Sequence, residues 1–403
     1  MTPKAYEIPD GQRSRPRAWI VCPYLGRGSE PWLWRQVVGI RRFDRTVLTA
    51  KQENKRDYPT PNVTVVEDER VPPQEQGLAR WLRRANRGAH GNYFALDRRS
   101  SARLARLAEV EPPDVLLCHF GHLAVRFVPL ARRLGVPIVA HFHGMDLSSS
   151  LRNRWYRWSL ERTLPELAAA VVVGSHQQQL LASKGFPAER LHLIPCGVPV
   201  DDFPSPRSDR TNDPIRFITV CRLVPWKGVD ISIRALAELH SRGVDAELHV
   251  LGDGPERLAL ENLTTQLNLT DWVVFHGPLP QGEVHKQLTQ TDVFLQHSRE
   301  YNGWVEGFGV SITEAAATGL PVVVSDCGGI VDQVEDGVTG FVVPQGDVLA
   351  MAERMLALAL DPDLRRALGR AGRRQARERF NTADQIESLE QVLLEAIHQR
   401  RLT

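Results

Sequence analysis

Short runs of β-branched residues alternate with longer amphipathic segments along the whole 403-residue chain. Neighbouring parallel strands need a crossover helix between them, so this alternation is typical of α/β folds. Two series of strands are predicted, at Ala18–Cys22, Thr46–Thr49, Asp114–Cys118, Pro137–Phe142 and Ala170–Gly174, and then at Arg216–Val220, Glu247–Leu251, Trp272–Phe275, Val293–Gln296 and Val322–Ser325. We therefore expect two doubly wound units in series.

The segment 201–214 separates the two series. It contains three prolines and four aspartates, a composition typical of a linker. The chain is long enough for two hydrophobic cores. We predict an N-terminal domain at 1–205, a second domain at 206–380 and a terminal segment at 381–403, with arginine-rich helices over 362–380 and 383–400.

Composition and charge narrow the class of protein. The five cysteines are scattered without a C-x-x-C pair, which favours neither a disulfide framework nor a zinc site and fits a reducing cytoplasm. The polar start, 1–17, does not resemble a signal peptide, and no apolar run is long enough to span a membrane. We predict a cytoplasmic protein.

Charge is divided unevenly along the chain. Residues 1–200 have 30 basic against 18 acidic side chains, net +12, whereas residues 201–403 have 20 against 30, net −10. The basic half predicts an anionic partner: a phospholipid surface, a lipid-diphosphate-linked sugar or an acidic saccharide. No nucleic-acid-binding module accompanies the charge, so we predict no nucleic acid partner.

Two acidic residues flank a glycine-containing turn at 306–314, which has the sequence E-G-F-G-V-S-I-T-E. Gly307 and Gly309 allow a ligand to approach the backbone, and the helix expected to begin there would attract phosphate. Glu306 lies just before this helix and Glu314 one turn inside it. A ligand with both phosphates and hydroxyls, such as a sugar nucleotide, suits this arrangement; a capped helix with surface glutamates is the alternative.

Two basic residues follow the predicted strand Arg216–Val220. Arg222 and Lys227 lie where ligands of open α/β sheets bind, at the carboxyl end of a strand. Together they could clamp a diphosphate and neutralise its charge as it leaves. Solvated surface cations are the alternative for this pair alone, but the acidic pair farther along the chain favours the ligand site.

These motifs together resemble the retaining glycosyltransferases of family 4, which have the GT-B fold of two Rossmann-like domains facing a central cleft. The resemblance covers 215–380 in the family's order, and it includes Arg222-Leu223, Lys227-Gly228, Gly252-Asp253-Gly254-Pro255, Phe275-His276-Gly277, Glu306-Gly307-Phe308-Gly309 through Glu314, Ala317–Val323, Gly328-Gly329 and Asp336–Phe341. Cys221 departs from it, because the family usually has glycine there.

The resemblance implies roles for single residues. Arg222 and Lys227 would take the diphosphate with the backbone N–H groups of Phe308, Gly309 and Val310. Glu314 would accept from the ribose hydroxyls, and Glu306 with Gly307 and Phe308 would hold hydroxyls of the donor sugar. The backbone of Gly277, Pro278 and Leu279 would contact the nucleobase of a UDP-, GDP- or ADP-sugar. The last helix would cross back to the first domain.

The first half contributes the acceptor side. His141 and His143 are two residues apart near a strand end, so they share a sheet face. His143-Gly144-x-Asp146 is similar to the family's H-G-x-D segment, which implies that His143 contacts the donor sugar. His141 is either a neighbour in the site or a packing residue.

A glycine-containing turn after the first strand is the second candidate on this side. Its members Gly26, Gly28, Ser29 and Glu30 precede a helix predicted at Trp32–Arg42. This turn, with 118–121 and 141–144, is similar to family members that build exopolysaccharide and lipopolysaccharide. We assign Gly26, Gly28, Ser29, Glu30, His119, His141 and Asp146 to the acceptor side.

No metal site is predicted. His119 and His122 lie near His141 and His143 in sequence, but their spacing matches no standard ligand pattern. The sequence also has no convincing D-x-D metal motif, and the cations at 222 and 227 could replace a divalent ion on the diphosphate. Aromatic and basic side chains mix at 80–84 and 152–158, which suits either peripheral membrane contact or ordinary core packing.

The predicted reaction moves a sugar from a nucleoside diphosphate sugar to a hydroxyl of a saccharide or lipid-linked saccharide, with retention of configuration. The only co-substrate is the nucleotide sugar, without a metal or other cofactor. A glycolipid-forming transferase, a sugar-nucleotide epimerase or phosphorylase, and a non-catalytic sugar-nucleotide-binding partner are the alternatives.

Overall fold

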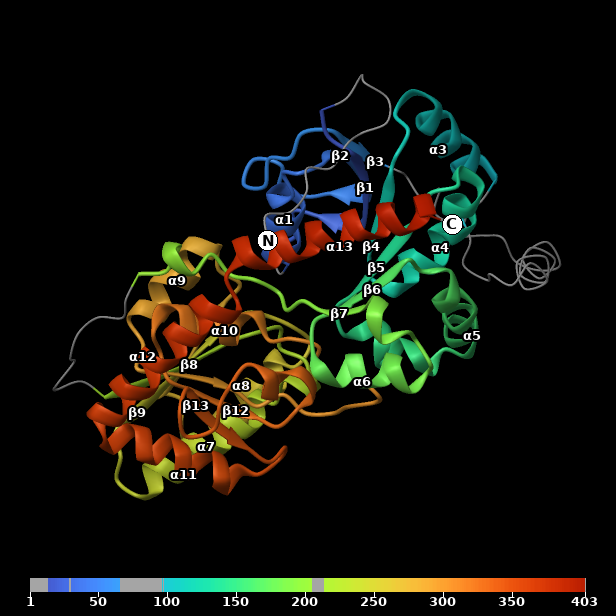
Figure 1. Ribbon diagram of the computed structural model, residues 1–403. Coiled ribbons are helices and arrows are strands. Elements are labelled where there is room, and N and C mark those ends of the chain that lie inside the picture. The colour runs from blue at the N-terminus through green and yellow to red at the C-terminus, as the bar shows by residue number, and fades with distance from the viewer. Residues whose placement is uncertain (1–13, 29, 66–95, 97, 205–213, 403) are drawn as a thin grey trace. The chain divides into compact units, whose positions relative to one another are not determined.

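The computed structural model describes residues 14–28, 30–65, 96, 98–204 and 214–402 (Figure 1). Contacts divide the chain into two compact units. Unit 1 comprises 1–172, 178–194 and 386–403, and unit 2 comprises 173–177 and 195–385. Apart from 173–177, unit 1 thus extends from the start of the chain to Ile194, and the segment from Ile386 onward belongs to it again. The predicted linker lies mostly outside the described residues, because 205–213 are not among them.

Unit 1 is built on a seven-stranded parallel sheet with the order β3-β2-β1-β4-β5-β6-β7. Its strands are β1 (Arg17–Leu25), β2 (Asp44–Gln52), β3 (Val63–Val65), β4 (Val115–His119), β5 (Ile138–Phe142), β6 (Ala169–Val172) and β7 (Leu191–Leu193). The five strands predicted for this half are confirmed, and β3 and β7 were missed. The order reverses between β1 and β4, which makes their carboxyl ends the switch point where ligands bind.

Helices cover both faces of this sheet. The helices are α1 (Pro31–Gly39), α3 (Arg98–Val110), α4 (Gly121–Leu134), α5 (Arg154–Thr163), α6 (Ser175–Ser183) and α13 (Thr382–Leu402), with short 3-10 turns at Met145–Leu147, Ser149–Arg152, Leu164–Glu166 and Ala188–Arg190. On one face, α3, α4 and α5 bury a core around Trp19 and Phe142. On the other, α1 and α13 pack on Ile20, Leu117 and Val139 (Figure 1).

Helix α13 is attached to unit 1 by polar as well as apolar contacts. Leu389 and Leu393 are fully buried in the core that it shares with the sheet. The carboxylate of Glu390 accepts the backbone N–H groups of Arg41 and Arg42 at 2.5 and 2.6 Å. Gly39 ends α1 where a side chain would collide with Ile386 of α13. The helix predicted to continue to Arg42 stops three residues earlier, and the N–H groups of Arg41 and Arg42 bond to Glu390 instead of continuing it.

Unit 2 repeats the plan with a six-stranded parallel sheet of order β10-β9-β8-β11-β12-β13. The strands are β8 (Ile215–Val220), β9 (Ala246–Leu251), β10 (Val273–Gly277), β11 (Val293–Gln296), β12 (Val322–Ser325) and β13 (Gly340–Val343). The five predicted strands are confirmed and β13 was missed. The order reverses between β8 and β11, whose carboxyl ends form the second switch point.

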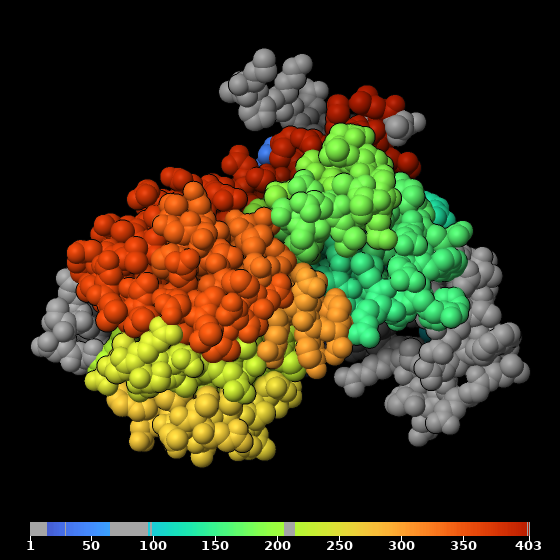
Figure 2. All heavy atoms as spheres, turned by 90° about the horizontal axis from the view of Figure 1, so that it is seen from below, coloured from blue at the N-terminus to red at the C-terminus, as the bar shows by residue number. Residues whose placement is uncertain are grey.

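The helices of unit 2 are α7 (Val229–Ser241), α8 (Arg257–Gln266), α9 (Gln281–Thr289), α10 (Val310–Thr318), α11 (Val348–Leu360) and α12 (Pro362–Arg379), with 3-10 turns at Val200–Asp202, Pro225–Lys227 and Gly328–Asp332. Helices α7, α8, α11 and α12 cover one face, and α9 and α10 cover the other. The later elements of this unit, drawn orange to red, gather in one continuous surface in Figure 2. The expectation of two doubly wound α/β units is thus confirmed.

Candidate functional site

A buried ion pair joins the two predicted motifs of unit 2. The Lys227 Nζ lies 2.5 Å from the Glu306 Oε2, although 79 residues separate them in sequence. Lys227 ends the 3-10 turn after β8, and Glu306 lies in the loop between β11 and α10. Only 7% of the Glu306 side chain is exposed, so Lys227 supplies the counter-charge that a buried carboxylate requires. The two motifs therefore form one site.

Polar residues at the end of β11 complete the surroundings of Glu306. Ser298 Oγ donates to the same carboxylate oxygen at 3.1 Å, and Gln296 Nε2 lies 3.4 Å from it. Both residues are fully buried. Because β8 and β11 are neighbours at the switch point, Lys227 and these two side chains converge on Glu306 from the edge of the sheet where α/β proteins bind ligands.

Two glycines allow the loops to approach this closely. Gly228 has φ +63°, and a Cβ there would lie 1.8 Å from the carbonyl oxygen of His297. A Cβ on Gly329 would lie 2.0 Å from the carbonyl oxygen of Gly307, while the Gly329 N–H donates to the backbone carbonyl of Glu306 at 2.9 Å. Glycine has no Cβ, so it tolerates both the positive φ and the close approach of backbone. The K-G and G-G motifs therefore let the loops of Lys227 and Glu306 lie close enough to form the ion pair.

Helix α10 begins directly after this loop, as predicted, with Gly309 at its N-cap and no capping side chain. The Gly309 N–H is not free for a phosphate, because it donates to the Gln333 Oε1 at 3.2 Å. Its contact with a phosphate would require this bond to open, and it stays a prediction. Phe308 is buried and packs edge-on against Phe380. The N–H groups of Val310 and the residue after it lie in the first turn of the helix, which is where anions bind to helices.

Glu314 and Arg222 differ from Lys227 in their partners. Glu314 is buried in α10, and its Oε1 accepts from the Gln281 Nε2 of α9 at 2.9 Å. Arg222 is exposed, with its guanidinium 5.9 Å from the centre of the Trp226 ring. Both Arg222 and Lys227 lie near enough to Cys221 to lower the pKa of its thiol, which burial raises. The two cations thus share one neighbourhood.

The predicted nucleobase contact lies at the end of the edge strand β10. Gly277 has φ +72°, and its carbonyl accepts the N–H of Gly252 at 2.9 Å. Pro278 is exposed and Leu279 is half-buried against the apolar core under α9. The structure leaves this backbone at the carboxyl edge of the sheet, and its contact with a base stays a prediction.

Sequence reasoning missed a histidine beside Glu306. The short segment 173–177 belongs to unit 2, and Ser175 donates through its N–H and its hydroxyl to Asp332, both at 2.7 Å. This anchors His176 near the loop. Burial lowers the pKa of His176, whereas Asp332 and Glu306 raise it. The G-S-H sequence directly after a predicted strand was the available signal.

In unit 1, the H-G-x-D segment is organised by Asp146. This fully buried carboxylate accepts backbone N–H groups from Gly121 at 2.8 Å, from Gly144 at 3.0 Å and from His143 at 3.1 Å. Burial raises its pKa, and these bonds lower it. Asp146 therefore fixes the loop that carries His143 and has no surface for an acceptor, which corrects its predicted place on the acceptor side.

Three histidines meet at the switch point of unit 1. His119 and His141 are register partners on β4 and β5, and both are fully buried. His143 is half-buried, and its Nε2 lies 3.1 Å from the Nδ1 of His119. Burial lowers the pKa of all three imidazoles, that of His119 to about 3. His119 and His141 have no exposed surface, so neither can contact an acceptor directly, whereas His143 can.

Ion pairs between charged side chains stabilise the turn after β1. Gly26 has φ +80° and lies where a Cβ would collide with the carbonyl of Glu53. Arg27 packs over the ring of Tyr24 and lies 3.8 Å from both Glu30 and Glu53. Gly28 has open space around it, and Ser29 lies outside the described residues. The turn leads into α1, as predicted, and its ligand role stays a prediction.

The aromatic and basic segment at 152–158 forms the start of α5. Trp155 is 41% exposed with Arg154 stacked on it, and Trp158 packs under Arg162, whereas Tyr156 faces the core. The similar segment at 80–84 lies outside the described residues. Within the part of the chain that the structure describes, no helix has the length and apolarity needed to cross a membrane.

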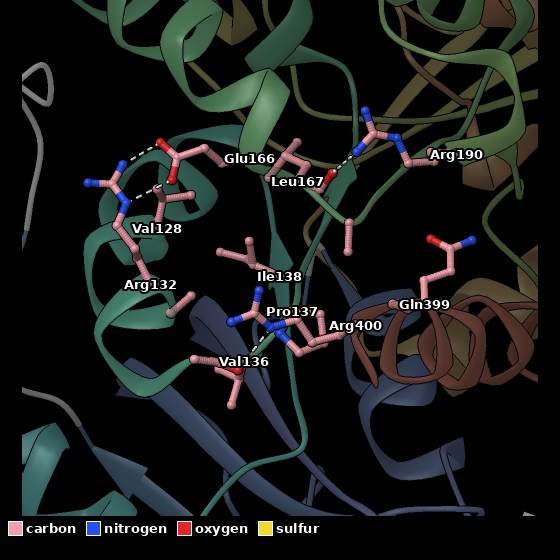
Figure 3. A pocket seen from close by; sticks show the side chains of 14 residues that line it. Val128, Arg132, Val136, Pro137, Ile138, Glu166, Leu167, Arg190, Gln399 and Arg400 are labelled. Carbon is pink, nitrogen blue, oxygen red and sulfur yellow. Dashed lines mark hydrogen bonds and ion pairs between the residues drawn. The ribbon is translucent and has the colours of Figure 1, made fainter. Parts of the chain in front are cut away.

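A pocket of about 340 Å³ lies at the amino ends of strands of the unit 1 sheet, at the end opposite to the switch point (Figure 3). Pro137 and Ile138 line it where β5 begins, so it is far along the strand from the switch point. Its guanidinium groups are engaged: Arg132 pairs with Glu166, Arg190 donates to Leu167 O, and Arg400 donates to Gly135 O. We assign this pocket no role.

His297, next to the ion pair, predicts how unit 2 responds to acid. It is fully buried, its Nε2 accepts the N–H of Gly346 at 2.8 Å, and desolvation lowers its pKa to about 4. A histidine of the unfolded chain takes up a proton near pH 6.5, whereas His297 in the folded protein does so only near pH 4. Below about pH 6.5 protons therefore favour the unfolded state, so the full free energy of unfolding is present above that pH and falls as the pH drops toward 4.

Below about pH 6.5, we expect the free energy of unfolding of unit 2 to fall by up to about 1.4 kcal/mol per pH unit from this group alone. Denaturant unfolding between about pH 6 and about pH 5 measures the slope. The slope should be shallower in His297→Gln, whose amide oxygen can still accept the Gly346 N–H. Equal slopes in the two proteins would contradict this account.

Comparison with known proteins agrees with this geometry. Residues 202–375 match the family model "Glycosyl transferases group 1", and residues 59–202 match "Glycosyltransferase Family 4". WcaL of Salmonella typhimurium, named for colanic acid biosynthesis, is 31% identical over 286 residues, 70% of each chain. A GDP-mannose-dependent phosphatidylinositol monomannoside mannosyltransferase of Mycolicibacterium smegmatis is 36% identical over 62% of this chain and 68% of its own.

Solved structures extend the likeness to the whole fold. HepE of Anabaena, solved in complex with UDP, superposes with a TM-score of 0.75 over 94% of this chain and 99% of its own, at 19% identity. This likeness supports the GT-B fold, and the relatives at 31% and 36% identity support the family. The chain belongs to glycosyltransferase family 4.

Proposed function

We propose that this glycosyltransferase moves a sugar from a nucleoside diphosphate sugar to a hydroxyl of a saccharide or lipid-linked saccharide, with retention of configuration. The observation that carries the proposal is the buried Lys227–Glu306 pair at the switch point of unit 2. A cation held against a carboxylate beside a helix start suits a ligand with an anionic diphosphate and a polar sugar.

Binding of the donor would redistribute these charges. The diphosphate binds to Lys227 and to the exposed Arg222. Their positive charges neutralise the negative charge that grows as the leaving group departs. Glu306, still held by Ser298, accepts hydroxyl groups of the donor sugar. His143 adds a neutral imidazole toward the same sugar. The departing phosphate accepts the proton of the acceptor hydroxyl, so no protein nucleophile is needed.

Glu314 and the strand end at Gly277–Leu279 would hold the nucleoside. Glu314 is buried but bonded to a neutral amide, Gln281, which a ribose hydroxyl can replace as donor. The two cations make a divalent ion on the diphosphate unnecessary, and we propose a metal-independent transfer in the cytoplasm. The basic first half would serve an anionic acceptor or peripheral contact with the membrane face.

The acceptor is proposed to belong to cell-surface polysaccharide biosynthesis. The name of WcaL supports this choice, and it matches the subgroup resemblance of the N-terminal motifs. A glycolipid-forming transferase is the second candidate. The mycolicibacterial relative, whose name specifies a phosphatidylinositol mannoside acceptor and a GDP-mannose donor, favours it.

One assay separates these possibilities from the other enzyme classes. The purified protein is incubated with UDP-, GDP- and ADP-sugars in excess EDTA, with and without lipid-linked or soluble saccharide acceptors, and the products are identified by mass spectrometry and NMR. We expect an acceptor-dependent release of nucleoside diphosphate and an anomeric configuration equal to that of the donor. Isomerised donor without transfer, or an inverted product, would refute the proposal.

Glu314→Ala should weaken donor binding more than it slows the chemical step. The substitution removes a ribose acceptor, whose hydrogen bonds to a charged group contribute about 1.5–3 kcal/mol, but it leaves the diphosphate contacts in place. We expect the donor Kd to rise about tenfold or more, while the single-turnover rate at saturating donor changes little. A reduced rate with an unchanged Kd would reverse the assigned role.

A further inference from the structure

The three histidines of unit 1 form a cluster that the proposed reaction does not fully use. Each of them offers a ring nitrogen, and these three nitrogens all lie within 4.8 Å of one another. The arrangement follows from strand geometry. His119 and His141 are register partners on adjacent parallel strands, and His143 follows His141 by two residues on the same face. Sequence spacing alone does not reveal this grouping.

The ring nitrogens of the cluster are poorly satisfied by the protein. His119 Nε2, His143 Nδ1 and both nitrogens of His141 are buried without a hydrogen bond of ordinary geometry in the described part of the chain. His141 also has the backbone of Ile194 close by. Buried polar atoms are nearly always paired, so the unpaired nitrogens of His141, beside the paired nitrogens of His119 and His143, indicate a missing partner.

The distances suit a transition metal ion. Two nitrogens bound to tetrahedral zinc at 2.0–2.1 Å lie about 3.3 Å apart. The measured separation of His119 Nδ1 and His143 Nε2 is 3.1 Å. A ring nitrogen of His141 lies within 4.8 Å of a ring nitrogen on each of the other two histidines.

The surroundings can accommodate a buried positive charge and give access to it. Asp146 lies against the same loop, and its carboxylate accepts the backbone N–H of His143. His143 is the member with exposed surface, so an ion and a water ligand can enter on its side. Trp32 and Phe120 flank the His143 ring at centroid distances of 4.4 and 4.8 Å and restrict its orientation.

We propose that His119, His141 and His143 form a binding site for a divalent transition metal ion, with zinc as the ion that three neutral imidazoles and an open fourth position suit. The hydrogen shared by His119 Nδ1 and His143 Nε2 moves to the outer nitrogen of its ring when the ion binds. Occupation also removes the His143 lone pair from any other ligand. If the proposed function is correct, zinc therefore inhibits the transfer.

Isothermal titration of the EDTA-treated, desalted full-length protein with zinc chloride tests the site. We expect one zinc per chain, with affinity lowered at least tenfold by His119→Gln and by His141→Gln. His122→Gln is the matched control, because His122 follows His119 closely in sequence and lies outside the cluster. Zero stoichiometry in the wild-type protein, or equal affinity in all four proteins, would overturn the proposal.

X-ray absorption of the zinc-loaded wild-type protein gives a second measurement that does not depend on variants folding. We expect the scattering pattern of three imidazole ligands, whereas a shell with fewer than two imidazoles would also overturn the site. Activity at the same zinc concentrations separates this proposal from the proposed function. Stoichiometric binding without inhibition would support the metal site and remove His143 from the donor contacts.

Discussion

Lys227→Ala should lower kcat about a hundredfold or more, which corresponds to about 3 kcal/mol of lost transition-state stabilisation. Lys227 is the one cation in direct contact with Glu306 in the described residues, at 2.5 Å. Its charge matters most when the diphosphate departs, because the negative charge on the leaving group is then greatest. Single-turnover kinetics at saturating donor measures the effect on the chemical step.

The control for this substitution has to separate chemistry from folding. Removing Lys227 also leaves Glu306 buried without its counter-charge, which destabilises unit 2. The folded fraction of each variant is therefore measured by thermal unfolding, and rates are compared per folded protein. Lys286→Ala is the matched control, because that lysine pairs with Glu283 at an exposed surface. Wild-type turnover in folded Lys227→Ala would remove this lysine from the mechanism.

Asp146→Ala should be the most destabilising single substitution considered for unit 1. It deprives three buried backbone N–H groups, those of Gly121, His143 and Gly144, of their acceptor. Each unsatisfied buried donor costs about 1–3 kcal/mol, so we expect the free energy of unfolding of unit 1 to fall by about 4 kcal/mol. Denaturant unfolding followed by tryptophan fluorescence measures this loss.

Two comparisons show whether the loss comes from those bonds. Asp146→Asn keeps one acceptor oxygen but turns an amide toward another N–H, so its effect should be intermediate. Asp326→Ala removes the acceptor of the exposed Gln345 N–H and should cost less than about 1 kcal/mol. An Asp146→Ala protein as stable as wild type would show that the H-G-x-D loop is held by other contacts.

Much of the fold could be predicted because its signals are local. Strands such as β8 and β12 are buried on both faces, so their apolar runs stand out from the amphipathic helices. The strands β3 and β7 have three residues each, too few to show a pattern. β13 was missed although it has four residues, as many as β12. The end of α1 was also missed, because it depends on α13, which lies at the other end of the chain.

The site shows the same division between local and long-range information. The placement of Lys227 and Glu306 in one site could be predicted because each lies at a recognisable strand or helix end, whereas their ion pair was not predicted. The bond between Gly309 and Gln333 could not, since nothing in either motif specifies the other. The register that brings His119 beside His141 is set by packing of whole strands, which spacing in the sequence does not express. Asp146 could be placed in its motif but not assigned to the interior.

The central claim is that the Lys227–Glu306 site holds the diphosphate of a sugar nucleotide. Isothermal titration of UDP, GDP and ADP into the wild-type protein and Lys227→Ala, both in excess EDTA, tests it most directly. The account predicts that one nucleotide binds the wild-type protein with one-to-one stoichiometry and binds Lys227→Ala at least tenfold more weakly. Binding of none of the three, or equal affinity for the folded variant, would contradict it.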